Sequence, residues 1–130
     1  MKIKYYSILI VLFGLIVSCG AVNKDLPSIK VSELQARLKT DTSLVLLDVR
    51  TPEEYNGPLG HIDGSLLIPL SELESRISEL DKYKDKEIIV YCRSGNRSHT
   101  ATGILLDKGF KAVNMLGGMK AWDSLPQNQK

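Results

Sequence analysis

The segment from Glu87 to Gly103, EIIVYCRSGNRSHTATG, constrains the possible folds more than any other part of the chain. It opens with a short apolar run rich in β-branched residues, Ile88 to Tyr91, a pattern typical of a strand buried on both faces. A polar stretch follows at once, and apolar residues at helical spacing then predict a helix that ends before Gly109. We therefore predict a strand, a tight polar loop and a helix, with Cys92 where the strand ends.

A cysteine in this position is suited to form a thiolate. Unpaired backbone N–H groups at a helix N-terminus and nearby guanidinium charges lower the pKa of a thiol, and they also attract small anions. Arg93 and Arg97 flank Gly95 in the predicted loop. The alternative is an inert core cysteine, because free cysteine is often buried. The polar residues after Cys92 favour the reactive interpretation.

Apolar runs alternate with helical patterns along the rest of the chain. We predict further strands at 29–31, 44–47, 66–68 and 112–116, and helices at 32–40, 51–55, 71–80 and 119–125. Three of these helices begin with a capping-box pattern, at Ser32–Gln35, Thr51–Glu54 and Ser71–Glu74. Because the strands lack an alternating polar face, the pattern predicts an α/β fold, with a parallel sheet covered by helices on both faces.

The predicted sheet also indicates where a site would lie. In open parallel sheets, ligands bind beyond the carboxyl ends of the strands. Asp48 and Cys92 both follow predicted strands. We therefore expect these two side chains at the same edge of the sheet.

The first residues of the chain have the pattern of an export signal. Lys2 and Lys4 precede an apolar run over 8–17 that is too short for a comfortable membrane span. The sequence IVSCG at 16–20 resembles the lipobox of bacterial lipoproteins, which implies cleavage before Cys19 and its lipidation. The alternatives are a plain secretory signal or an uncleaved short anchor.

These features predict four regions: a signal peptide over 1–18, a lipidated tether over 19–28, a folded domain over 29–126 and a polar tail over 127–130. The protein would be exported in a bacterial cell envelope, on the periplasmic or outer-surface side, and anchored to the membrane through the lipid on Cys19. With Cys19 lipidated, Cys92 has no intrachain partner, and an unpaired cysteine in an oxidising compartment favours a reactive role.

Charge and composition exclude some other functions. Without Lys2 and Lys4 the 17 basic residues fall to 15, which equals the number of acidic residues. No basic stripe interleaved with aromatic residues is present, so we expect no nucleic-acid partner. The 2 histidines are too few for a histidine metal cluster. We expect no metal and no cofactor.

Four motifs, in this order, resemble those of single-domain rhodanese-like sulfurtransferases of the thiosulfate sulfurtransferase type. They are LLDVRTPEEY at 46–55, GHIDGSLLIPL at 60–70, IVYCRSGNRS at 89–98 and NMLGGMKAW at 114–122. The resemblance implies that residues 29–126 form a rhodanese domain, an α/β fold with a central parallel sheet of about five strands. Two departures are a loop between Tyr55 and Gly60 that is two residues longer than usual, and Met119 where the family often has an aromatic residue.

The resemblance also implies a reaction. Cys92 would attack the outer sulfur of thiosulfate, form a persulfide, release sulfite and pass the sulfur to cyanide or a thiol. The partners would be a small anionic sulfur donor and such an acceptor, and we expect a monomer. Asp48 and Arg50 would orient loops near the site, and Glu54 would cap its helix or pair with Arg50. The donor would be bound by the loop residues Arg93, Ser94, Gly95, Asn96, Arg97 and Ser98.

Two other functions remain open. Cysteine-dependent phosphatases and arsenate reductases share the anion-binding loop, but they place an arginine six residues after the cysteine, where this chain has Ser98. A persulfide carrier or binding module for a partner protein is the second alternative. Of the remaining residues, His61 belongs to a fold motif of the family, the role of His99 stays open, and Trp122 is expected to anchor the core.

Overall fold

The computed structural model describes residues 25–126. The predicted signal peptide, Cys19, most of the tether and the tail over 127–130 lie outside these residues. Within the described part, no helix is both long enough and apolar enough to cross a membrane.

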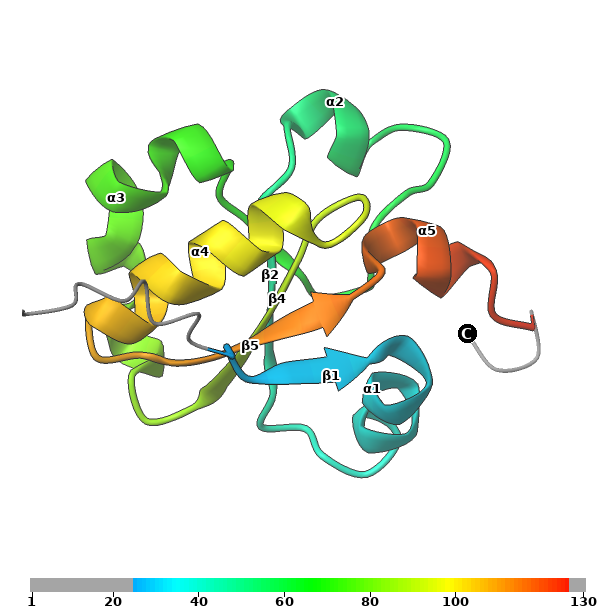
Figure 1. The fold of residues 1–130 in the computed structure, drawn as a ribbon, viewed down its shortest axis with the longest axis horizontal. Coiled ribbons are helices and arrows are strands. Elements are labelled where there is room, and N and C mark those ends of the chain that lie inside the picture. Colours follow the sequence, from blue (N-terminus) through cyan, green and yellow to red (C-terminus); the bar gives the residue numbers. More distant parts are fainter. Residues whose placement is uncertain (1–24, 127–130) are drawn as a thin grey trace, which may run out of the picture.

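Strands and helices alternate along the described chain (Figure 1). The strands are β1 (Ser28–Lys30), β2 (Val45–Asp48), β3 (Leu66–Leu67), β4 (Glu87–Tyr91) and β5 (Lys111–Leu116). The α-helices are α1 (Val31–Leu38), α2 (Pro52–Tyr55), α3 (Leu73–Arg76), α4 (Asn96–Asp107) and α5 (Gly118–Asp123). Two 3-10 segments, η1 (Leu70–Glu72) and η2 (Ile77–Tyr83), flank α3.

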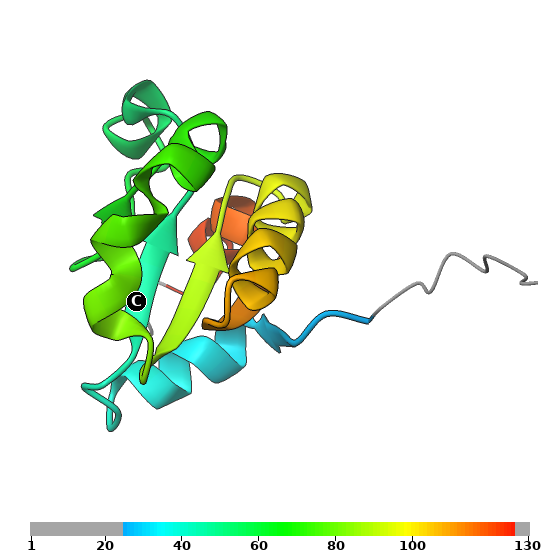
Figure 2. The same cartoon turned by 90° about the vertical axis from the view of Figure 1, so that its left-hand side faces the viewer.

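The strands form one five-stranded sheet in the order β1-β5-β4-β2-β3, and every pairing is parallel. Figure 2 shows β2 and β4 side by side near the middle of the sheet. The predicted α/β fold with a central parallel sheet of about five strands is therefore confirmed. The strand predicted over 29–31 corresponds to β1, which lies at one end of the order.

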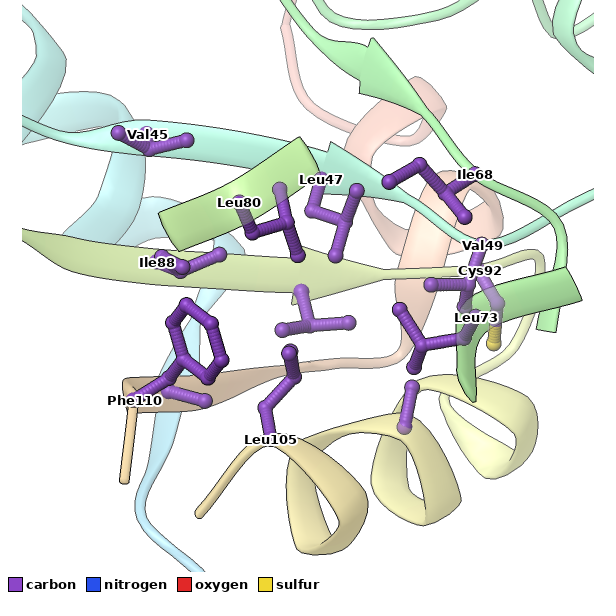
Figure 3. Close-up of a cluster of buried hydrophobic side chains, with 13 residues drawn as sticks. Val45, Leu47, Val49, Ile68, Leu73, Leu80, Ile88, Cys92, Leu105 and Phe110 are labelled. Carbon is purple, nitrogen blue, oxygen red and sulfur yellow. The ribbon is translucent and has the colours of Figure 1, made fainter. Parts of the chain in front are cut away.

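Helices cover both faces of the sheet, as predicted, and each face has its own apolar core. The first core joins β2, β4 and β5 to Leu73 of α3 and Leu105 of α4, and Cys92 is one of its members (Figure 3). The second core joins the opposite face to Leu34 of α1 and Met119 of α5. Trp122 is only half-buried against this second core, so it anchors the core in part.

β4 lies at the centre of this arrangement because its side chains are apolar on both faces. Ile88 and Val90 belong to the first core, whereas Ile89 and Tyr91 belong to the second. All four are fully buried, at 0% exposure. The buried strand predicted before Cys92 is confirmed, and its central position brings Cys92 to the middle of the carboxyl edge of the sheet.

Local signals at two helix ends are confirmed. At α2, Glu54 N–H donates to Thr51 Oγ1 (3.2 Å) and Thr51 N–H donates to Glu54 Oε2 (3.1 Å), which is the predicted capping box. At the end of α4, Gly109 has a φ of 85°, and Phe110 N–H donates back to the carbonyl of Leu105. This left-handed glycine ends the helix as predicted.

The other two predicted capping boxes are wrong. α1 follows β1 without a loop and has Lys30 as its N-cap, so Ser32 lies inside the first turn. The segment predicted as a helix over 71–80 is divided into η1, α3 and η2, and Ser71 lies inside η1. In both places the helical turn begins before the predicted N-cap serine, and the residue at the N-cap position makes no side-chain hydrogen bond to the helix.

Candidate active site

Cys92 occupies the first position after β4, where the backbone turns into α4. Its side chain is 1% exposed and packs at the edge of the first core. Gly95 N–H donates to Cys92 Sγ at 3.1 Å, and Ser98 Oγ lies 3.4 Å from the same sulfur. The turn requires Gly95, which has a φ of 108° at the N-cap of α4. The predicted strand, loop and helix are confirmed.

This loop favours the charged form of the sulfur. Burial raises the pKa of Cys92, but hydrogen bonds from the Ser98 hydroxyl and from the backbone of Ser98, Gly95 and Ser94 outweigh it. The pKa of the thiol therefore lies below its ordinary value. Hydrogen bonds to the sulfur account for the lowering, and the Ser98 hydroxyl contributes the largest of them.

The two arginines of the loop have different surroundings. Arg97 forms a bidentate ion pair with Glu54 of α2, with Nη1–Oε2 at 2.8 Å and Nη2–Oε1 at 2.7 Å. Arg93 is exposed at the surface. Glu54 caps its helix as predicted, but its ion-pair partner is Arg97 rather than Arg50. This pair connects α2 to the loop that contains Cys92.

Hydrogen bonds from the Arg97 guanidinium and from Thr51, together with the positive charge of Arg97, hold the pKa of the Glu54 carboxyl at about 2, well below its usual range. A carboxylate whose pKa is lower in the folded than in the unfolded chain stabilises the fold above the unfolded pKa, and this contribution is lost as the pH falls through the folded pKa. We expect Glu54→Gln to lower the stability at pH 7, with a difference from wild type that shrinks between about pH 5 and pH 2. Urea midpoints measured at several pH values test this.

The matched control for that series is Glu53→Gln, because Glu53 is exposed on the same short helix. We expect its urea midpoint to follow that of wild type throughout. If the urea midpoint of Glu54→Gln differs from that of wild type by the same amount at pH 7 and at pH 2, the lowered pKa of Glu54 is not the source of the stability difference.

Asp48, the last residue of β2, and Arg50 just after the strand form a buried ion pair, at 0% and 1% exposure. Arg50 Nη2 donates to Asp48 Oδ2 at 2.6 Å, and Arg50 Nε contacts both carboxylate oxygens at 3.0 Å. The same guanidinium donates to the carbonyls of Gly60 (2.7 Å) and Glu54 (3.3 Å). The pair therefore fastens α2 and the loop after it to the carboxyl edge of the sheet.

The turn between β5 and α5 also supports the Cys92 loop, through backbone hydrogen bonds. Met119 N–H donates to the Cys92 carbonyl at 2.9 Å, and Lys120 N–H donates to the Arg93 carbonyl at 3.0 Å. Gly118 lies so close that a Cβ there would be 2.5 Å from the carbonyls of both Cys92 and Arg93. Only glycine fits at this position without displacing the loop.

Gly118→Ala should consequently destabilise the protein more than an ordinary glycine substitution. Gly64→Ala is the matched control, since Gly64 also has a positive φ but a Cβ added there would meet no heavy atom within 4 Å. The control substitution should lower the free energy of unfolding by about 1–2 kcal/mol, from backbone strain alone. Gly118→Ala should cost clearly more in urea unfolding and should slow Cys92 alkylation by displacing the loop. If the two variants lose equal amounts of unfolding free energy, the loop moves away from the added Cβ without a further loss of stability, and the proposed close packing at Gly118 is wrong.

Sequence reasoning missed Asn114 and Lys120. Asn114 Oδ1 accepts a hydrogen bond from Ser98 Oγ at 2.6 Å, and Asn114 is 4% exposed. A polar residue inside the apolar strand pattern over 111–116 was the signal for it. Lys120 and Arg93 line a cavity of about 350 Å³ beside the loop, together with Arg50, Glu54, Pro58 and Leu59.

The remaining residues singled out in the sequence contribute no side chain to the contacts around Cys92 Sγ described above. Ser94 and Asn96 are exposed, and so is His99 on α4. His61 stacks on Tyr55 with ring centroids 3.6 Å apart, which is a structural contact. Among residues 25–126, no cluster of three or more His, Cys, Asp or Glu side chains could hold a metal ion.

The fold and this arrangement define a class of parallel α/β domain in which a cysteine-centred loop lies at the carboxyl edge of the sheet. Comparison with known proteins identifies the family. The model of the rhodanese family, described as a rhodanese-like domain, matches residues 30–125. The chain belongs to this family.

Three similar proteins illustrate the relationship. A rhodanese-like domain protein from Staphylococcus aureus has a crystal structure that matches with a TM-score of 0.68 and 32% identity, over 75% of this chain and 91% of that one. The thiosulfate sulfurtransferase PspE of Escherichia coli is 38% identical over 57% of this chain and 69% of its own length. The "Putative sulfur carrier protein YrkF" of Bacillus subtilis is 40% identical over 75% of this chain, which spans 51% of that longer relative.

Proposed function

We propose that this protein is a sulfurtransferase that moves sulfane sulfur from thiosulfate, or a related donor, to cyanide or a thiol through a persulfide on Cys92. The observation that carries the proposal is the set of hydrogen-bond donors that the loop directs at Cys92 Sγ. The similarity to the Escherichia coli thiosulfate sulfurtransferase supports thiosulfate as the donor.

The reaction has two displacements at sulfur. The Cys92 thiolate attacks the outer sulfur of thiosulfate, an S–S bond forms, and sulfite leaves with the electron pair of the bond that breaks. The acceptor then attacks the outer sulfur of the persulfide and regenerates the thiolate. Backbone N–H groups of the loop stabilise the anionic sulfur in both forms, as an oxyanion hole stabilises developing charge. Because Cys92 is 1% exposed, only slim donors and acceptors reach its sulfur.

The charges around the loop indicate how an anionic donor would be held. Glu54 already occupies both terminal nitrogens of the Arg97 guanidinium. Arg93 lines the adjacent cavity together with Lys120. We propose that Arg93 binds the sulfonate oxygens of the donor, and that Arg97 contributes chiefly by joining the loop to α2.

Persulfide formation tests this function directly. We expect the reduced full-length protein to gain one sulfur, about 32 Da, on incubation with thiosulfate alone, and to lose it with release of thiocyanate when cyanide is added. Intact-protein mass spectrometry and a thiocyanate assay measure the two half-reactions separately. A folded, reduced protein that gains no mass and shows no turnover with thiosulfate or with another persulfide donor would overturn the proposal.

A persulfide carrier for a partner protein is the second candidate, favoured by the 40% identity to a relative named as a sulfur carrier. The two candidates differ in the second half-reaction. A carrier would form the persulfide stoichiometrically but turn over slowly with cyanide and small thiols. A sulfurtransferase would release thiocyanate through many cycles.

We also propose export and lipid anchoring through Cys19, on the sequence pattern at 1–20 alone. Growth of a bacterial host on labelled palmitate should label the full-length protein, and Cys19→Ser should abolish the label. Label that persists in Cys19→Ser would contradict the proposal.

A further inference from the structure

Three buried side chains from separate elements form a continuous chain of contacts that ends at the candidate nucleophile. Cys92 lies at the end of β4, Ser98 lies on α4 and Asn114 lies on β5, and they are 1%, 0% and 4% exposed. Ser98 Oγ is 3.4 Å from Cys92 Sγ and 2.6 Å from Asn114 Oδ1. Asn114 forms its side-chain hydrogen bond with Ser98 rather than with the sulfur, so its effect on the sulfur must pass through Ser98.

The hydroxyl of Ser98 has one proton and three acceptors around it. Besides Asn114 Oδ1 and Cys92 Sγ, the carbonyl oxygen of Gly95 lies 3.1 Å away. Since a serine hydroxyl donates a single hydrogen bond, these acceptors compete for it. The carboxamide of Asn114, by contrast, presents either an acceptor or a donor, because half a turn about its terminal torsion exchanges Oδ1 for Nδ2.

We propose that Asn114 is a positioning residue that sets the direction of the Ser98 hydroxyl and thereby the readiness of Cys92 to act as a nucleophile. With the thiol, S–H donates to Ser98 Oγ, and Ser98 donates to Asn114 Oδ1. With the thiolate or the persulfide anion, Ser98 turns its proton to the sulfur, and the Asn114 amide rotates so that Nδ2–H donates to Ser98 Oγ. The inference rests on the proposed function of Cys92 and adds a residue to it.

The proposal explains why an amide, rather than an acid or an apolar residue, suits this position. An amide satisfies Ser98 in both charge states of the sulfur. A carboxylate only accepts, so it would hold the Ser98 proton and withhold it from the sulfur. An apolar residue would leave the hydroxyl oxygen without its donor when the sulfur is charged.

The charged groups already present around the loop are the same in every variant needed to test this, and only Asn114→Asp adds a charge. They are Arg97 of α4 with its partner Glu54 of α2, the buried Asp48–Arg50 pair at the end of β2, Arg93 of the loop and Lys120 of α5. Substitutions at 98 and 114 leave all of these groups in place. In the uncharged variants Ser98→Ala and Asn114→Leu, changes in the titration of Cys92 therefore report the contacts of Ser98 and Asn114, and the comparison of the two backgrounds separates the relayed effect of Asn114→Asp from its direct charge effect.

The pH dependence of Cys92 alkylation by iodoacetamide measures thiolate formation without any sulfur donor or acceptor. Asn114→Asp keeps the shape of the side chain, and we expect it to raise the midpoint of the alkylation profile by about 1 pH unit or more. Ser98→Ala should also raise the midpoint. In the Ser98→Ala background, Asn114→Asp should shift the midpoint by less than in wild type, because the hydroxyl that relays the effect is gone and only the direct Coulombic effect of the added carboxylate on the thiolate is left.

Asn114→Leu is the uncharged companion variant, and it keeps the test valid if Asn114→Asp does not fold. We expect a smaller rise of the midpoint with Ser98 present and no rise in the Ser98→Ala background. Equal shifts in the two backgrounds, or no shift with Ser98 present, would overturn the proposal. Failure of sulfur transfer with thiosulfate is a separate result, since alkylation needs only the thiolate.

Discussion

Cys92→Ser should leave no sulfur adduct after incubation with thiosulfate and should reduce thiocyanate formation by at least about 10³-fold. The serine hydroxyl is a far weaker nucleophile than a thiolate, and the hydrogen bonds of the loop do not ionise it at neutral pH. The substitution changes little volume in the first core, where Cys92 packs. Intact mass and initial rates of the full-length variant provide the measurement.

The control for this experiment is Thr100→Ala, an exposed substitution on α4 outside the candidate site. It should form the adduct and turn over like wild type. The urea midpoint of Cys92→Ser must also show a folded protein. If the folded Cys92→Ser variant still gains about 32 Da from thiosulfate, the sulfur is carried elsewhere and the assignment of Cys92 is wrong.

Arg50→Met should destabilise the protein by about 3–5 kcal/mol, because it leaves the Asp48 carboxylate buried without its partner. It also removes the hydrogen bonds to the carbonyls of Gly60 and Glu54, which fasten α2 and its loop. Replacing both members, as Asp48→Leu with Arg50→Met, should be less destabilising than Arg50→Met alone, since no buried charge is then left unpaired. Urea unfolding measures all of these variants.

An exposed ion pair supplies the comparison. Arg76 pairs with Glu79 at 2.7 Å, but the two side chains are 36% and 52% exposed. Arg76→Met should therefore lower the free energy of unfolding by no more than about 1 kcal/mol. If Arg50→Met costs as little as Arg76→Met, the buried pair contributes nothing beyond an ordinary surface pair, and its role in holding the loop would have to be abandoned.

Several features could be predicted from the sequence because their causes are local. A β-branched apolar run, an abrupt polar loop and a helical repeat were enough to predict β4, the loop after Cys92 and α4. The capping box at Thr51 was predicted correctly because its two residues satisfy each other across three positions of the chain. The same pattern at Ser32 failed because β1 leads directly into α1.

The contacts within the site could not be predicted in the same way. Glu54 and Arg97 are 43 positions apart, and only the parallel order of β2 and β4 brings α2 beside the start of α4. Ser98 and Asn114 meet because β4 and β5 are neighbours in the sheet. Of the two alternatives expected for Glu54, the helix cap is confirmed and the pair with Arg50 is not, because the buried Asp48 is the carboxylate that satisfies Arg50.

The amino-acid sequence alone was enough to predict the fold class, the position of Cys92 at the end of a buried strand and the tight polar loop after it. These follow from hydrophobic periodicity and backbone conformation, which act over a few residues. Three features depend on the tertiary arrangement: which donors reach Cys92, which carboxylate pairs with Arg97 and how closely Gly118 approaches the loop. Hydrogen bonds and ion pairs form only at short range, so the order of the strands determines which residues distant in sequence become partners.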